Sequence, residues 1–223
     1  NFTPAKTIET LDKAGVSTAF LSVTEPGVWF GDDFSKERQD AIGMSRDLND
    51  YGARMVSDYK GRFGLFAVLP LPDIDASLKE IAYAFDTLKA QGVGLLTSYG
   101  AKWLGDASFA PVFEELNRRG AILYSHPTDA TCCHNLLPNT SPGTIEWNTD
   151  TSRAIFSVIN DGSELFGSAT TLADGSVAAD MKRCRSAAVR SLWIISSSRH
   201  TGSEPCESAR YDADDSLLFS CSP

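Results

Sequence analysis

Residues 111–126 read PVFEELNRRGAILYSH, a short amphipathic stretch, a glycine and an apolar run that ends in histidine. The pattern predicts a helix over 111–119 that Gly120 closes, and then a strand over 121–125. A strand that is apolar on both faces and follows directly on a helix is typical of a parallel sheet covered by helices. This stretch therefore predicts an α/β fold.

The same unit occurs three more times upstream. Helices are expected over 4–14, over 35–60 and onward from a cap at Asp75 or Ser77. The glycines that close them are Gly15, Gly61 and Gly92, and the strands that follow are expected over 16–23, 63–69 and 93–97. A (β/α) barrel and an open doubly wound sheet both satisfy this order. No Gly-x-Gly-x-x-Gly follows the first strand, which disfavours a dinucleotide-binding sheet. In both topologies the functional loops lie past the carboxyl ends of the strands.

Aromatic residues stand at two of these strand ends. Trp29 lies between glycines in PGVWFGD (26–32), and Tyr99 lies in TSYG (97–100). Large rings at this edge suit a flat, apolar ligand, whereas burial of a ring to anchor a loop is an equally ordinary role. Both interpretations stay open for Trp29 and Tyr99.

His126 ends the fourth predicted strand, in YSHPT (124–128). A histidine in this position projects from a rigid element into the loop face, where barrel enzymes place metal ligands and acid–base groups. A hydrogen bond to a neighbouring loop is the structural alternative, and position alone does not separate the two. Cys132, Cys133 and His134 are consecutive, which does not match the two separated ligand pairs of a structural zinc site.

Composition excludes some partners. The 223-residue chain has a formal net charge of -9, which disfavours binding to nucleic acid or to an anionic membrane. No stretch approaches the roughly 18 apolar residues that a membrane span needs. Five cysteines without a regular spacing indicate a reducing compartment, and the expected location is the cytoplasm.

The repeating pattern ends near Asp161. Residues 162–223 hold 13 serines, against 12 in the preceding 161 residues, and no helix–glycine–strand unit. The sequence is therefore divided into a barrel-like part, 1–161, and an atypical serine-rich tail, 162–223. A disordered tail explains the change, and so does a shifted reading frame or an unspliced intron, which we favour.

Six segments in order resemble one known family: LDKAGVSTA (11–19), PGVWFGD (26–32), GRFGLFA (61–67), GVGLLTSYG (92–100), FEELNRR (113–119) and SHPT (125–128). They are similar to the amidohydrolase-related, metal-dependent decarboxylases typified by aminocarboxymuconate semialdehyde decarboxylase. Within that family the chain looks most like the 6-methylsalicylate decarboxylase type. The resemblance covers residues 1–161.

The resemblance implies a partial (β/α)8 barrel of the TIM type, comprising about its strands 2 to 5, with an irregular C-terminal tail. It implies non-oxidative decarboxylation of a small aromatic acid such as 6-methylsalicylate, a divalent zinc or manganese ion, no organic cofactor, and a homodimer. His126 matches the metal ligand after the fifth strand, and Trp29 and Tyr99 would be walls of the substrate site. The other ligands and the catalytic histidine of the family have no match, so no catalytic residue is assigned.

Two alternatives remain. A metal-dependent hydrolase of the same superfamily would use the same ligand, and a non-catalytic remnant or interaction protein would keep the half-barrel without the metal site. A barrel that stops near its fifth strand leaves an open sheet edge. We therefore expect this chain to fold poorly or to need partners, with impaired activity.

Overall fold

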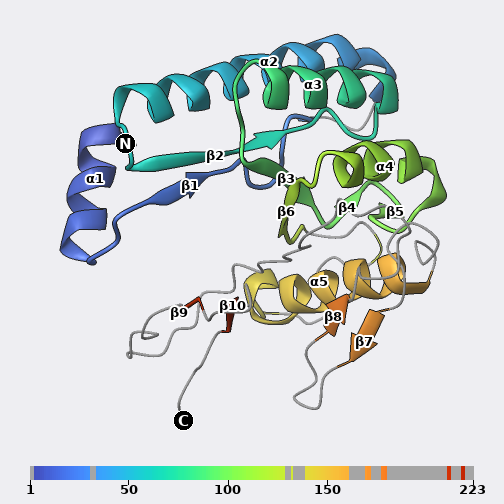
Figure 1. The fold of residues 1–223 in the computed structure, drawn as a ribbon. Helices are drawn as coiled ribbons and strands as arrows, with labels where there is room; N and C mark the ends of the chain where they lie inside the picture. Colours follow the sequence, from blue (N-terminus) through green and yellow to red (C-terminus); the bar gives the residue numbers. More distant parts are fainter. Residues whose placement is uncertain are drawn as a thin grey trace.

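The computed structural model describes residues 3–30, 34–128, 132 and 139–160, together with four short strands between residues 169 and 218 (Figure 1). Most of the serine-rich tail, 162–223, lies outside the described residues. The expectation that this tail is disordered or arises from a frame error therefore stays an expectation. The short strands are β7 (Ala169–Thr171), β8 (Val177–Ala179), β9 (Arg210–Tyr211) and β10 (Leu217–Leu218), and each pair, β7–β8 and β9–β10, is antiparallel.

Four parallel strands form the central sheet in the order β1-β2-β3-β6. They are β1 (Ala19–Leu21), β2 (Phe63–Val68), β3 (Gly92–Leu96) and β6 (Ile122–His126). The spatial order follows the chain order without a reversal, whereas a doubly wound sheet reverses its strand order at a switch point. The sheet is thus a continuous part of a (β/α) barrel, and the predicted fold class is confirmed.

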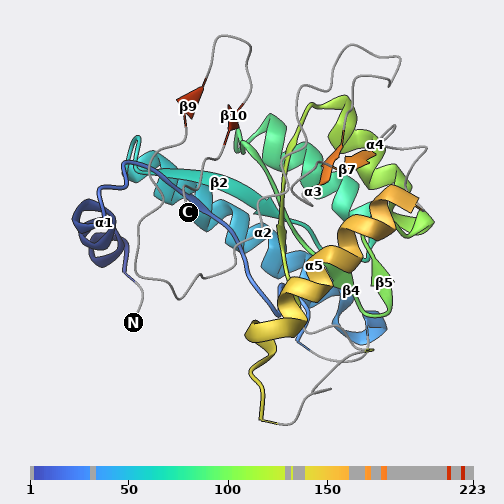
Figure 2. The same ribbon diagram turned by 90° about the horizontal axis from the view of Figure 1, so that it is seen from below.

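Three helices connect the strands: α2 (Phe34–Asp58), α3 (Ile74–Asp86) and α4 (Ala110–Arg118). Helices α2 and α3 lie side by side over the sheet, and α4 packs beside α3 (Figures 1 and 2). Helix α1 (Pro4–Lys13) precedes the first strand and begins at Thr3, whose hydroxyl accepts a hydrogen bond from the Lys6 N–H. Between β3 and α4 lie the short strands β4 (Ser98–Tyr99) and β5 (Lys102–Trp103) and the 3₁₀ turn η1 (Ala107–Phe109).

The predicted glycine caps are largely confirmed. Gly15, Gly61 and Gly120 each follow a helix with φ between 63° and 77°, the left-handed region that a helix C-terminus favours. The expectations for α3 are wrong at both ends. Asp73, rather than Asp75 or Ser77, caps it by accepting the Ala76 N–H, and the helix ends at Asp86, so Gly92 begins β3 instead of closing the helix.

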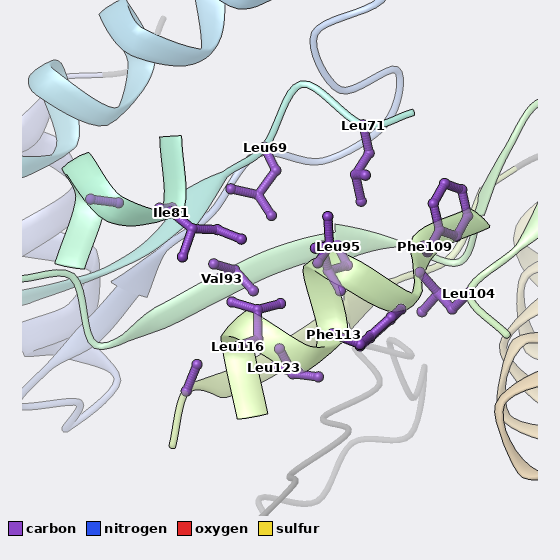
Figure 3. Close-up of a cluster of buried hydrophobic side chains, with 14 of the residues drawn as sticks. Leu69, Leu71, Ile81, Val93, Leu95, Leu104, Phe109, Phe113, Leu116 and Leu123 are labelled. Carbon is purple, nitrogen blue, oxygen red and sulfur yellow. The ribbon is translucent and has the colours of Figure 1, made fainter. Parts of the chain in front are cut away.

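One hydrophobic core fills the space between the sheet and helices α3 and α4 (Figure 3). Alternate residues of the strands supply one side of it, among them Val93 and Leu95 of β3. Ile81 of α3 and Leu116 of α4 supply the other side, and all four are 2 % exposed or less. This packing explains why each strand reads as an apolar run.

The opposite face of the sheet carries a row of rings. Phe20 stacks on Phe66 with centroids 4.7 Å apart, and Phe66 stacks on Tyr124 at 5.7 Å. Phe20 is 47 % exposed, and Tyr124 is partly buried. Side chains two residues apart on a strand share a face, so His126 lies on the same face as Tyr124.

A fifth helix, α5 (Pro142–Asn160), was not predicted from the sequence. Its buried residues Asp150, Thr151, Ala154 and Val158 are spaced as one helical face. Ala154 and Val158 join the main core. The helix lies so close to Gly105 that a Cβ on that glycine would stand 2.1 Å from the Ser157 carbonyl oxygen. Among the described residues, no helix is long and apolar enough to cross a membrane.

Candidate active site at the carboxyl end of the sheet

His126 is the last residue of β6 and is paired in register with Leu96, the last residue of β3. Its carbonyl oxygen accepts a hydrogen bond of 3.0 Å from the Thr97 N–H. The imidazole is partly buried, and its Nδ1 lies 2.7 Å from the Pro127 carbonyl oxygen. The histidine predicted to end a strand therefore projects from a fixed backbone at the functional edge.

The contact with the Pro127 carbonyl determines the tautomer of the His126 imidazole. A carbonyl oxygen only accepts hydrogen bonds, so the Nδ1 of His126 carries the proton that it donates. In the neutral ring the lone pair then lies on Nε2, which is the arrangement of a metal-ligating histidine that is oriented by a backbone carbonyl. His126 therefore has the chemistry of a single metal ligand.

A complete metal site is not formed by the described part of the chain. Within it, no group of three His, Cys, Asp or Glu side chains is placed to hold a metal ion. Cys132 is disulfide-bonded, which the irregular cysteine spacing had not predicted, and all other cysteines lie outside the described residues, as does His134. Among the described residues, His126 could therefore supply one metal ligand, but not a complete site.

A buried polar network lies beside His126, and sequence reasoning missed its centre, Asp150 of α5. This carboxylate is 1 % exposed and is hydrogen-bonded to the hydroxyl of Thr97. Its Oδ1 accepts the indole N–H of Trp103 at 3.1 Å, and its Oδ2 lies 3.4 Å from the Thr128 nitrogen. The network joins the ends of β3 and β6 to α5. The helical spacing of positions 150, 151, 154 and 158 could have indicated that one face of a helix is buried there, but not the partners of Asp150.

Trp29 and Tyr99 line one small pocket, as the sequence placed them at one edge. Val68, Gly94 and Leu96 also line it; His126 is not among its lining residues, although its partner Leu96 is. The Trp29 indole N–H donates to the Leu71 carbonyl oxygen at 2.5 Å, which anchors the 23–30 loop to the segment after β2. Phe30, the other aromatic of that loop, is 67 % exposed.

Tyr99 is buried and makes specific contacts in addition to lining the pocket. Its ring packs at a steep angle against Phe109, with centroids 5.8 Å apart, and its hydroxyl accepts the Leu96 N–H at 3.0 Å. Burial raises the pKa of the Tyr99 phenol well above its usual range. The phenol is therefore neutral at physiological pH, and it fixes the end of β3 at the pocket.

Comparison with known proteins identifies a family and relatives that match most of this chain. Residues 10–183 match the family described as Amidohydrolase. The decarboxylase macB of Penicillium terrestre is 36 % identical over 170 residues, which cover 72 % of this chain and 49 % of that protein. The 6-methylsalicylic acid decarboxylase of Penicillium expansum is 37 % identical over 153 residues, 66 % of this chain and 45 % of the relative. The chain spans about half the length of the curated relatives it matches.

A solved structure shares the fold. The 5-carboxyvanillate decarboxylase of Novosphingobium aromaticivorans, complexed with manganese and 4-hydroxy-3-methoxy-5-nitrobenzoic acid, superposes with a TM-score of 0.62 at 22 % identity. The match covers 69 % of this chain and 44 % of that one. The resemblance to amidohydrolase-related decarboxylases that the six sequence segments carry is confirmed.

Proposed function

Since the chain belongs to the amidohydrolase family, we propose that it serves the non-oxidative decarboxylation of a salicylate-type aromatic acid, with 6-methylsalicylate as the first candidate substrate. The observation that carries the proposal is the imidazole of His126, which stands at the carboxyl end of β6 with Nδ1 committed to Pro127 and Nε2 left for a ligand. Several proteins to which the chain is similar are named as decarboxylases of aromatic acids.

His126 would hold a divalent cation, zinc or manganese, through Nε2. A bound cation of this kind supplies Lewis-acid polarisation of the carboxylate and of the neighbouring hydroxyl of the substrate. Imidazole nitrogen is a preferred ligand of zinc, whereas manganese would also need several oxygen ligands beside it. Because one imidazole does not make a site, the remaining ligands would have to come from residues of this chain outside the described part.

Trp29 and Tyr99 would form the apolar wall for the aromatic ring. Both line the same pocket, and both are held in place by hydrogen bonds to or from backbone, Trp29 through Leu71 and Tyr99 through Leu96. A neutral phenol beside the ring adds no charge that would repel the acid. Rigid aromatic surfaces orient a flat substrate at low entropic cost.

The reaction needs one proton and releases CO₂. A proton is delivered to the ring carbon that bears the carboxylate, the bond between that carbon and the carboxylate carbon breaks, and its electron pair restores the aromatic ring. With 6-methylsalicylate the products are CO₂ and 3-methylphenol. No oxidant is consumed. No described residue is assigned as the proton donor.

The experiment measures metal retention and CO₂ release together. The 223-residue chain, loaded with Mn²⁺ or Zn²⁺ and dialysed, is assayed with 6-methylsalicylate for CO₂ and 3-methylphenol and analysed for bound metal. We expect weak, metal-dependent product formation that His126→Gln abolishes and that Glu114→Gln, at an exposed position of α4, leaves unchanged. Failure of the native chain to retain either metal, with no product formed, contradicts the proposal and favours a non-catalytic interaction protein.

A metal-dependent hydrolase of the same superfamily is separated by the products. A parallel assay offers the chain an aromatic lactone such as dihydrocoumarin and follows ring opening. Retained metal with lactone opening and without CO₂ release assigns the same His126 site to hydrolysis instead.

A further inference from the structure

Asp150 is a buried carboxylate for which the proposed reaction has no direct use. It is 1 % exposed, and its hydrogen bonds go to neutral groups, the Thr97 hydroxyl, the Trp103 indole and Thr128, instead of to a cation. Taking a carboxylate out of water costs free energy unless several donors replace the lost hydration. We therefore expect the Asp150 carboxylate to hold the groups that donate to it in fixed positions.

One peptide unit links Asp150 to His126. The Pro127 carbonyl and the Thr128 N–H belong to the same planar peptide, so fixing one end fixes the other. Its N–H donates to the Thr97 hydroxyl at 3.0 Å and faces the Asp150 Oδ2 at 3.4 Å. Its carbonyl oxygen is the group that accepts the His126 Nδ1–H at 2.7 Å.

We propose that Asp150 is a positioning residue for His126: together with Thr97 it holds the 127–128 peptide so that its carbonyl keeps the imidazole in the Nδ1–H form, which leaves the Nε2 lone pair available to a ligand. The inference rests on the proposed metal-ligand role of His126. The chain of contacts runs from α5 through one rigid peptide to the ring. The hydrogen bonds of Thr97 with Asp150 and with Thr128 are buried, and the contact of the His126 ring with the Pro127 carbonyl is partly buried.

A second buried carboxylate shows what a purely structural role looks like. Glu80 of α3 is 3 % exposed and accepts hydrogen bonds from Asn49 and from Arg46, both on α2. It joins two helices and has no hydrogen bond to residues 126–128 among the described contacts. Glu80→Ala is therefore a matched control, because it removes a buried carboxylate of similar burial without touching the peptide that orients His126.

The test reads the tautomer of His126 directly. Nitrogen-15 spectra of the imidazoles are recorded on metal-free chain at about pH 8, above the ordinary histidine pKa of about 6.5. The signal missing from His126→Gln provides the assignment among the three histidines. We expect the native chain and Glu80→Ala to show His126 protonated at Nδ1. Asp150→Ala and Thr97→Val should lose that form, and Asp150→Asn, which keeps one acceptor oxygen, should retain part of it.

The outcomes separate this inference from the proposed function. If Asp150→Ala and Thr97→Val keep the native His126 spectrum, the positioning role is wrong, whereas the metal-ligand role stands. If the native chain itself lacks the Nδ1–H form, both are overturned. Should Asp150→Ala fail to fold, Thr97→Val decides alone, since it removes one hydroxyl and keeps the volume of the side chain.

Discussion

Phe66 and Tyr124 stack with ring centroids 5.7 Å apart, although their strands, β2 and β6, are separated by β3. They meet because β3 contributes Gly92 and Gly94 on this face, and glycine leaves no side chain between the rings. A Cβ on Gly94 would lie 3.9 Å from both Phe66 and Tyr124. The glycines of β3 thus let an aromatic row run beneath the edge that carries His126.

The two glycines of β3 should respond differently to alanine. A Cβ on Gly92 would stand 2.3 Å from the backbone oxygen of Ile122, so Gly92→Ala forces β3 and β6 apart. We expect a loss of about 2 kcal/mol in the free energy of unfolding, as for other overpacked cores. Gly94→Ala meets atoms only at ordinary contact distance and should change stability by less than about 1 kcal/mol. Urea unfolding of the two variants measures both; equal effects would contradict this account of the strand packing.

The side chain of Asn49 should contribute strongly to the free energy of unfolding. Its amide accepts the Val68 N–H and donates to the Val68 carbonyl, both at 2.9 Å, and so replaces a neighbouring strand at the end of β2. Asn49→Ala leaves both buried backbone groups unpaired, and we expect a loss of about 3 kcal/mol. The matched variant Asn160→Ala, at an exposed position of α5, should cost less than about 0.5 kcal/mol. A loss below about 1 kcal/mol for Asn49→Ala, measured by urea unfolding, would refute this role.

Glu115 should make stability depend on acid pH. Its hydrogen bonds to Arg118, with a further contribution from Arg119, lower the pKa of the carboxyl to about 2, although desolvation acts in the opposite direction. Since the unfolded chain binds this proton more readily, the stabilisation is complete above about pH 4.5 and is lost as the pH falls toward 2. Glu115→Gln should cost about 1 kcal/mol at pH 7 and much less at pH 2.

The neighbouring exposed residue provides the control for that experiment. Glu114→Gln, one position away on α4, changes the same charge without removing the Arg118 and Arg119 hydrogen bonds, and should leave the pH profile of unfolding close to native. Matching profiles for the two variants would show that the arginine contacts do not stabilise the fold.

The repeating part of the fold could be predicted from sequence because its signals are local. Apolar strands, amphipathic helices and left-handed glycines follow from residue spacing and backbone sterics. The first strand proved shorter than expected, three residues from Ala19 to Leu21 instead of 16–23. Pairing determines strand length, and β1 is paired only with residues 63–65 of β2.

The candidate site could be predicted only where one residue carried the signal. His126 stood out because it ends a strand, and Trp29 and Tyr99 because they follow strands. Asp150 gave no such signal, since its role depends on α5 docking against residues more than 20 positions away in sequence. A buried network that joins separate elements depends on tertiary packing, so the local spacing of residues in the sequence does not predict it.

The central claim is that the Nε2 of His126 binds a divalent cation. Titration of the native chain with Zn²⁺, followed in the nitrogen-15 imidazole spectrum, tests it most directly. The account predicts that the Nε2 signal of His126 shifts as zinc is added while Nδ1 stays protonated toward Pro127. A His126 spectrum that zinc leaves unchanged, or a shift at Nδ1 instead, would contradict the claim.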